Sequence, residues 1–189
     1  PYTLVSEDDV KRERWKFNPA IAASLGISAE YGQRNLEHYT RELKASGKYA
    51  LTIWPYHAML GGIGHALVSL FEEALFFHSV ARYSQPDFVV KGAEPLTEHY
   101  SVLGPEVQEG FDGKPLARKS DKFIKKLKEF DVVVIAGQAK SHCVAWTIAD
   151  LLDDILLHDH TLAGKVYLLE DCTSPVVIPT RRWISLRCA

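Results

Sequence analysis

Two patterns of apolar residues recur along this chain, short continuous runs and stripes at helical spacing. The continuous runs predict buried strands at residues 49–54, 87–91, 132–137 and 165–171. The stripes predict helices at residues 29–46, 65–83, 120–130 and about 142–158, and a capping box at Ser6 and Asp9 predicts a short helix after it. Strands that are apolar throughout and alternate with helices are typical of an α/β fold, in which helices flank a parallel sheet on both faces.

The helix predicted at residues 65–83 is apolar around a large share of its circumference. One stripe comprises Leu67, Leu70, Phe71, Ala74 and Phe77, and a second stripe beside it comprises Val68, Leu75, Phe76 and Val80. A helix of this kind lies either at the centre of a core or half-buried against a partner subunit. The second arrangement predicts a homo-oligomer that associates through residues 65–83.

Composition narrows the class of protein. The 189 residues, 47% of them hydrophobic, suffice for a sizeable core, so we expect a single domain over residues 1–189. The net charge of −2 gives no electrostatic reason to expect a nucleic-acid partner. No apolar run reaches the roughly 18 residues of a membrane span. Three cysteines without regular spacing argue for a reducing compartment, so we expect a cytoplasmic protein with no membrane partner.

Polar groups follow three of the predicted strands. The segment Trp-Pro-Tyr-His (54–57) follows the first, Lys91 ends the second, and Cys143 comes after the third. Because sites in parallel sheets gather beyond the carboxyl ends of the strands, we expect these groups to share one crevice. Backbone N–H groups in the first turn of a helix stabilise a thiolate at Cys143 and can hold an oxyanion, and a Lys91 ammonium can assist or carry a proton. The alternative for a lone cysteine here is a small packed hydrophobic residue.

Three segments resemble the cysteine-hydrolase family of nicotinamidases and isochorismatase-like enzymes, and most of all its larger nicotinamidase-like branch. They are LTIWPYHAMLGGIGHAL (51–67), VVKGAEPLTEHYSVL (89–103) and VVVIAGQAKSHCVAWTIADLL (132–152), in the expected order. The resemblance implies an isochorismatase-like, Rossmann-type fold of three layers. It also implies hydrolysis of a small amide through a thioester, with nicotinamide as the favoured substrate.

The resemblance also implies roles for individual residues. Cys143 matches the nucleophile and Lys91 the lysine of an Asp–Lys–Cys trio. Ala139 follows a cis peptide bond in the family, and its N–H forms the oxyanion hole together with that of Cys143. Trp54 matches a residue that lies against the substrate ring, and His57 matches a metal ligand. The covalent step requires no cofactor, and a divalent, zinc-like metal is implied for the full-length protein.

Two parts of the chain depart from the family's pattern. Residues 1–49 match neither the Asp-x-Gln-x-Asp-Phe motif that supplies the catalytic aspartate nor the Asp-x-His that completes the metal site. Asp8 and Asp9 lie in a polar capping box, and we expect no strand before them. The simplest interpretation is a chain that lacks the family's first strand. The tail at residues 180–189 is the second departure, because it resembles neither the acidic helix nor the last strand of the family.

The sequence leaves three hypotheses for the function. The first is a cysteine-dependent hydrolase of a small amide. The second is a catalytically incomplete scaffold or oligomerisation subunit of the same fold. The third is nucleotide binding, which residues 61–64 (Gly-Gly-Ile-Gly) favour only weakly because they lack the Lys-Ser/Thr of a phosphate loop. His99 and Tyr100, in the long loop after Lys91, are further candidates for lining the site.

Overall fold

The protein has a mixed α/β structure, and its computed structural model describes residues 1–177. The strands and helices are β1 (Thr3–Val5), α1 (Glu7–Lys11), α2 (Pro19–Ser24), α3 (Ala29–Ala45), β2 (Leu51–Ile53), α4 (Ser69–Arg82), α5 (Asp121–Glu129), β3 (Val133–Gln138), α6 (Ala145–His158) and β4 (Val166–Ser174). A π-helical turn (Lys140–Val144) precedes α6, and a 3-10 helix (His160–Lys165) follows it. The helices predicted at 29–46, 120–130 and 142–158 are therefore confirmed, with ends that differ by a few residues. The tail at 180–189 lies outside the described residues.

The first part of the chain folds around helix α3. Strands β1 and β2 pair antiparallel, with Thr3 opposite Ile53. Helix α1 begins at the predicted capping box, in which the Ser6 side chain accepts from the Asp9 N–H. Along α3, Tyr39 and Leu43 are buried and pack with Val107 and Leu51. This packing fixes the start of β2, and with it the segment that carries Trp54.

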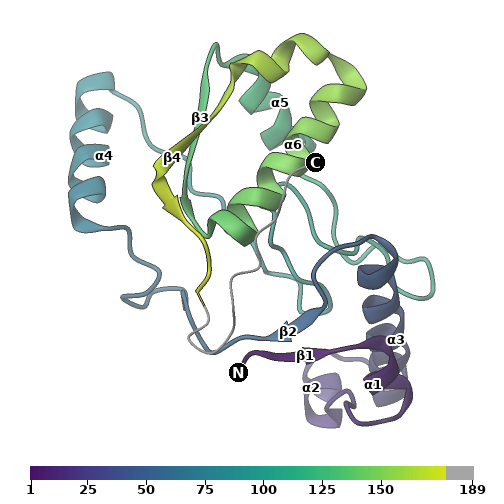
Figure 1. The fold of residues 1–189 in the computed structure, drawn as a ribbon. Helices are drawn as coiled ribbons and strands as arrows, with labels where there is room; N and C mark the ends of the chain where they lie inside the picture. The colour runs from purple at the N-terminus through teal and green to yellow at the C-terminus, as the bar shows by residue number, and fades with distance from the viewer. Residues whose placement is uncertain (178–189) are drawn as a thin grey trace.

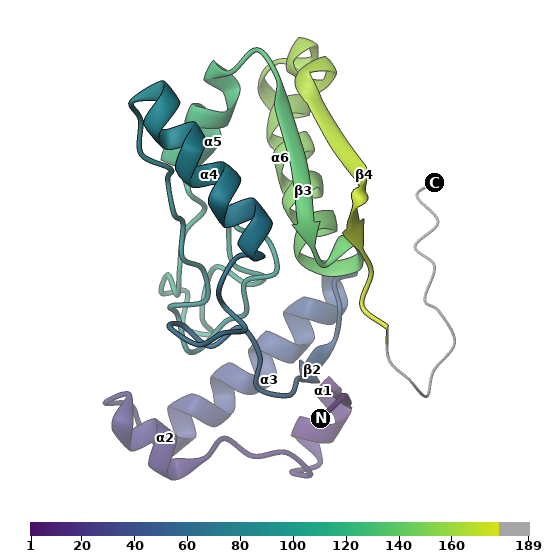
Figure 2. The same ribbon diagram turned by 90° about the vertical axis from the view of Figure 1, so that its left-hand side faces the viewer.

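The second part is built on the parallel pair of β3 and β4, in which Val133 lies opposite Val166. Helices α5 and α6 cover one face of this pair, as the two perpendicular views show (Figures 1 and 2). The core here consists of four fully or almost fully buried side chains, which are Leu103, Ile124, Leu151 and Ile155. The helix predicted at 142–158 has its apolar stripe at Val144, Ile148, Leu151 and Ile155. Ile148 is partly buried and the other three are buried, so the stripe marks the face of this segment that packs into the core.

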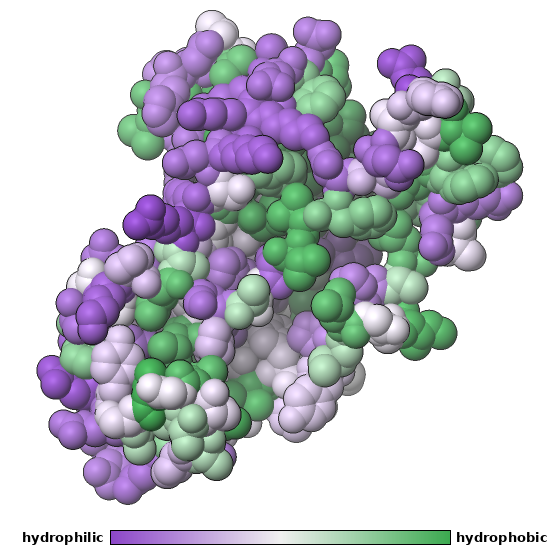
Figure 3. Space-filling model, turned by 180° about the vertical axis from the view of Figure 1, so that it is seen from behind, coloured by the Kyte–Doolittle hydropathy of each residue, from purple (hydrophilic) through white to green (hydrophobic). Residues whose placement is uncertain are grey.

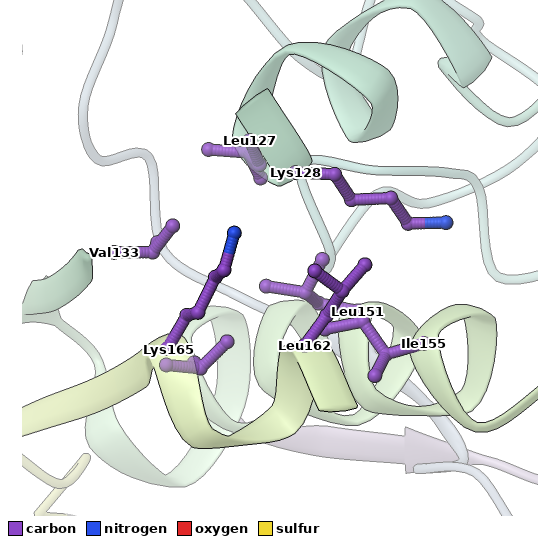
Figure 4. A pocket seen from close by; sticks show the side chains of 8 residues that line it. Leu127, Lys128, Val133, Leu151, Ile155, Leu162 and Lys165 are labelled. Carbon is purple, nitrogen blue, oxygen red and sulfur yellow. The ribbon is translucent and has the colours of Figure 1, made fainter. Parts of the chain in front are cut away.

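A small cavity remains where α5 and α6 meet the starts of β3 and β4. It has a volume of about 10 Å³, and the side chains of Leu127, Leu151 and Leu162 converge on it (Figure 4). The aliphatic stems of Lys128 and Lys165 complete its wall. A void of this size is at the lower limit for one water molecule, and its apolar lining offers that water no hydrogen-bond partner. The cavity is therefore a packing feature of the core.

Helix α4 lies on the other side of the β3–β4 pair from α5 and α6, apart from the rest of the chain (Figure 1). Within residues 1–177 none of its side chains is buried, and Phe76 and Phe77 are 63% and 60% exposed. Seen from behind, the helix stands clear of the body of the molecule (Figure 3). Two arrangements were predicted for residues 65–83. The first, a position at the centre of the core, is wrong for the described structure.

The sheet differs from the prediction in three ways. Residues 87–91, predicted as a strand, have irregular backbone with Phe88 and Val90 exposed. Strand β2 pairs antiparallel with β1 and not in one sheet with β3 and β4, so each sheet of the described residues has two strands. Strand β1 directly precedes the Ser6 capping box, where we expected none. A run of apolar residues becomes a strand only where a neighbouring strand accepts its hydrogen bonds, and sequence alone does not name that neighbour.

None of the helices in residues 1–177 combines the length and the apolar character that crossing a membrane requires.

Candidate active site

Cys143 lies in the turn that joins the carboxyl end of β3 to α6, as predicted. The peptide bond between Gln138 and Ala139 is cis. Ala139 occupies the N-cap position of the π-helical turn, and its carbonyl oxygen accepts from the N–H groups of His142 (3.0 Å) and Val144 (3.1 Å). The Cys143 side chain is partly exposed. The sulfur is therefore neither sealed in the core nor fully open to solvent.

Three hydrogen bonds from two separate segments hold this turn. The Tyr49 hydroxyl donates to the Ser141 carbonyl oxygen at 2.7 Å. The Val176 N–H donates to the Ser141 hydroxyl oxygen at 3.0 Å, and the Ser174 hydroxyl donates to the Gln138 side chain at 2.9 Å. The turn is thus tied to the segment before β2 and to the end of β4. Such bonds limit the backbone movement of the residues that flank Cys143.

An aromatic group lies beside the turn, centred on His142. The Tyr49 ring stacks on the His142 ring with centroids 4.5 Å apart, and the Trp54 and Tyr100 rings lie 5.3 Å and 5.5 Å away. Burial among these rings lowers the pKa of His142. The Ser141 hydroxyl oxygen lies 2.8 Å from His142 Nδ1. A neutral imidazole held in this way serves as part of an aromatic wall.

Lys91 reaches the same region from the irregular segment after α4. Its ammonium group donates to the carbonyl oxygens of His99 (2.9 Å) and Tyr100 (2.6 Å). Burial lowers the pKa of His99, and the positive charge of Lys91 lowers it further. Lys91 therefore lies at the loop 97–107, although the strand predicted to carry it does not form.

Tyr100 is the residue through which the predicted site residues meet. Its hydroxyl oxygen accepts from Trp54 Nε1 at 3.0 Å, and its carbonyl oxygen accepts from Lys91. Burial raises the pKa of the Tyr100 hydroxyl, and a negative charge on Cys143 is among the nearby charges that raise it further. Trp54 therefore contacts the Tyr100 hydroxyl and Lys91 the Tyr100 backbone, while the ring of His142, the residue before Cys143, lies 5.5 Å from the Tyr100 ring.

His57 lies at the edge of this group. Its side chain is exposed, its ring centroid is 6.4 Å from that of Trp54, and its Nδ1 lies 2.6 Å from the Pro55 carbonyl oxygen. Residues 1–177 contain no cluster of three or more His, Cys, Asp or Glu side chains that suits a metal ion. One histidine is a poor metal site because structural and catalytic sites use three or four protein ligands. The described residues therefore do not fit the metal implied by the resemblance.

Two carboxylates near Tyr100, the partly buried Glu98 and the buried Glu106, were not singled out from the sequence. Glu98 Oε2 accepts from the Tyr39 hydroxyl at 2.9 Å, and burial raises the pKa of Glu98 to about 7. Glu106 forms an ion pair with Lys48 at 3.0 Å and also accepts from the Tyr100 N–H at 3.2 Å. Tyr49, on the other side of the site, was likewise read only as the first residue of a strand. Nothing in the spacing of these residues indicates their contacts, because each contact joins segments far apart in the sequence.

No protein-family model, curated protein or solved structure matches this chain. The resemblance to cysteine hydrolases therefore stays a prediction from the sequence. Trp54 donates to the Tyr100 hydroxyl, and Lys91 donates to the Tyr100 backbone carbonyl. The ring of His142, the neighbour of Cys143, lies beside the Tyr100 ring.

Proposed function

We propose that this chain carries the covalent site of a cysteine-dependent hydrolase, which cleaves the C–N bond of a small amide through a thioester. The observation that carries the proposal is the meeting of Lys91 and Trp54 at Tyr100, beside the turn of Cys143. A packed structural cysteine needs neither an ammonium group nor an aromatic wall beside it. A nucleophile that attacks a planar amide uses both.

The proposed reaction has two steps. The Cys143 sulfur bonds to the carbonyl carbon, and the N–H groups of Ala139 and Cys143 hold the oxyanion. The C–N bond then breaks, and the nitrogen leaves as ammonia after receiving, through Lys91, the proton that the Cys143 thiol lost when its sulfur bonded to the carbonyl carbon. In the second step water attacks the thioester carbonyl, the carboxylic acid is released, and the thiol re-forms. The atoms balance without a redox partner or a metal.

The aromatic group favours a planar substrate. The rings of Trp54 and His142 lie edge to face at 5.3 Å, and Tyr49 stacks behind His142. Aromatic rings in offset or edge contact attract one another by about 0.5–1.5 kcal/mol beyond the burial of their area. The resemblance to nicotinamidases implies a heteroaromatic primary amide such as nicotinamide, and aromatic side chains beside the turn of Cys143 are compatible with a substrate of that class.

The proposal includes the three-layer fold and the homo-oligomer expected from the sequence. The face of β3–β4 opposite α5 and α6 is apolar and exposed, with Val134 at 59% and Tyr167 at 55%. A second layer of helices on this face would bury it. Helix α4 is equally unburied, and exposed apolar surface of this extent is typical of protein–protein contacts. We propose a cytoplasmic homo-oligomer in which residues 65–83 contribute to the contact.

The test is ammonia release from a panel of small primary amides that includes nicotinamide. We expect the wild-type protein to release ammonia from at least one of them. Cys143→Ala removes the nucleophile and is expected to abolish turnover. Cys172→Ala is the matched control, because Cys172 is an exposed thiol in β4 and has no role in the proposed reaction. Undiminished turnover by Cys143→Ala, or a wild type inert toward the whole panel, would contradict the proposal.

A second candidate function is a catalytically incomplete assembly subunit of the same fold. It is favoured by the unburied helix α4 and by the lack of a match to the family's aspartate motif. Under this hypothesis the protein associates but hydrolyses no amide, and Cys143 reacts with alkylating agents no faster than Cys172. Ammonia release and thiol alkylation therefore separate the two functions.

A further inference from the structure

A buried ion pair lies directly behind the candidate active site. The Glu106 side chain is 0% exposed and that of Lys48 is 18% exposed, and the Lys48 ammonium lies 3.0 Å from Glu106 Oε2. Glu106 Oε1 accepts from the Tyr100 backbone N–H at 3.2 Å. Taking a carboxylate out of water costs several kcal/mol unless a counter-charge and hydrogen bonds compensate for it. This pair therefore has a defined geometry that the loss of either partner disturbs.

The two partners come from different parts of the chain. Lys48 belongs to the connection between α3 and β2, and its ammonium lies 5.7 Å from the centre of the Trp146 ring in α6. Glu106 belongs to the loop 97–107, and its own N–H donates to the Glu98 carbonyl oxygen at 2.8 Å. The pair thus joins the connection after α3 to the loop, and lies beside the helix that follows Cys143. It acts at the point where the two halves of the fold meet.

The contact of Glu106 with Tyr100 links this pair to the site. The Tyr100 N–H is held by Glu106, its carbonyl oxygen accepts from Lys91, and its hydroxyl oxygen accepts from Trp54. A shift of the Tyr100 backbone would move the acceptors of both predicted site residues together. No other described contact of Tyr100 involves a charged, fully buried side chain.

We propose that Glu106, paired with Lys48, is a positioning residue that fixes Tyr100 and through it orients Lys91 and Trp54. Its catalytic consequence rests on the proposed hydrolase function, whereas its effect on the geometry of the site does not. Glu106 does not contact the substrate in this account. It acts only through the loop backbone.

The test uses Glu106→Gln, which keeps the shape and an acceptor oxygen but removes the charge, and Lys48→Gln, which removes the counter-charge. The first readout is the indole N–H resonance of Trp54 in a ¹H–¹⁵N spectrum of the full chain, assigned with Trp54→Phe. Without the ion pair, Glu106 no longer fixes the Tyr100 backbone, and the Tyr100 hydroxyl that accepts from Trp54 Nε1 moves with it. We therefore expect both variants to shift the Trp54 indole resonance. Lys48→Arg keeps the ion pair and is expected to restore the wild-type position.

The control is Lys11→Gln, which breaks an ion pair of α1 with Glu7 on the surface. It is expected to leave the Trp54 resonance in place. Movement in Glu106→Gln or Lys48→Gln no larger than in this control would overturn the proposal. If Glu106→Gln fails to fold, Lys48→Gln, changed nearer the surface, gives the same readout.

The second readout is turnover of the amide that the wild type hydrolyses. Misplacing a reacting group by about 1 Å costs up to about 100-fold in rate, so we expect kcat of Glu106→Gln to fall roughly 10- to 100-fold with KM little changed. A folded variant with the wild-type kcat would overturn the positioning role. If the wild type proves inert, the proposed function fails, but the Trp54 resonance still decides whether Glu106 positions Tyr100.

Discussion

At the scale of single residues, Glu98 is the carboxyl group whose raised pKa makes the stability of the protein depend on pH near neutrality. Burial raises its pKa to about 7 from 4.5, and the charge of Glu106 adds to the effect of burial. The folded protein therefore binds a proton at Glu98 between about pH 4.5 and 7 that the unfolded chain has released. The free energy of unfolding consequently falls as the pH rises through this window and is lowest above it.

This dependence predicts the behaviour of Glu98→Gln. The substitution removes the titrating group, so the difference in stability between wild type and variant is expected to change by up to about 3 kcal/mol between pH 4.5 and 8. Wild type loses stability relative to the variant as the pH rises. Urea unfolding of both proteins across this pH range measures the difference in their free energies of unfolding. Stability curves that run parallel would show that Glu98 does not carry a raised pKa.

Sequence reasoning identified the residues that carry the proposed chemistry but not those that hold them. Cys143, Lys91 and Trp54 were recognised because each follows an apolar run and matches a motif. Tyr49 and Glu106 have no such motif, and their contacts with Ser141 and Tyr100 depend on the tertiary fold. His57 matched a motif, yet its surroundings in the described residues do not complete a metal site.

At the scale of elements, α6 is the helix whose buried face the sequence determined most fully. The predicted stripe is Val144, Ile148, Leu151 and Ile155. Leu151 and Ile155 are buried within α6 and Val144 is buried in the turn before it, while Ile148 is partly buried. The reason is local, because amphipathic spacing specifies a face whatever that face packs against. The strand predicted at 87–91 failed for the opposite reason. Its apolar run indicates that the segment would be buried as a strand, but it contains no information on which neighbouring strand would pair with it.

Helix α6 gives a matched pair of substitutions. Leu151 is 1% exposed in the core cluster, and Leu157, on the same helix, is 82% exposed. Leu151→Ala is expected to lower the free energy of unfolding by about 2–5 kcal/mol because it leaves a cavity among Leu103, Ile124 and Ile155. Leu157→Ala is expected to change it by no more than about 0.5 kcal/mol. Equal effects of the two in urea unfolding would contradict the assigned face of α6.

At the scale of the whole molecule, the α/β class was predictable and the layered sheet was not. Alternation of strands and helices along the chain gives the class. The layers depend on which strands become neighbours, and β1, with three residues, is too short to show in the apolar pattern. Pairing of β1 with β2 produces a second small sheet in place of the continuous one that we expected.

The unburied helix α4 predicts self-association. Phe76 and Phe77 present aromatic surface that water does not solvate favourably, and a second copy of the chain would cover it. We expect the wild type to sediment as an oligomer and the double variant Phe76→Ser, Phe77→Ser to sediment as a smaller species. Leu157→Ser, at a still more exposed apolar site on α6, is the control and is expected to leave the assembly intact. A wild type that sediments as a monomer over the micromolar range would exclude a contact through α4.

The relative reactivity of two cysteines tests the proposed nucleophile most directly. Cys172 is exposed and Cys143 only partly so, which means that accessibility alone makes Cys172 the faster to react. A thiolate stabilised at the start of a helix reverses that order. The measurement is alkylation by iodoacetamide at pH 7, followed at each cysteine by peptide mass spectrometry. We predict that Cys143 is modified roughly tenfold or more faster than Cys172, and modification of Cys172 first would contradict a nucleophilic role for Cys143.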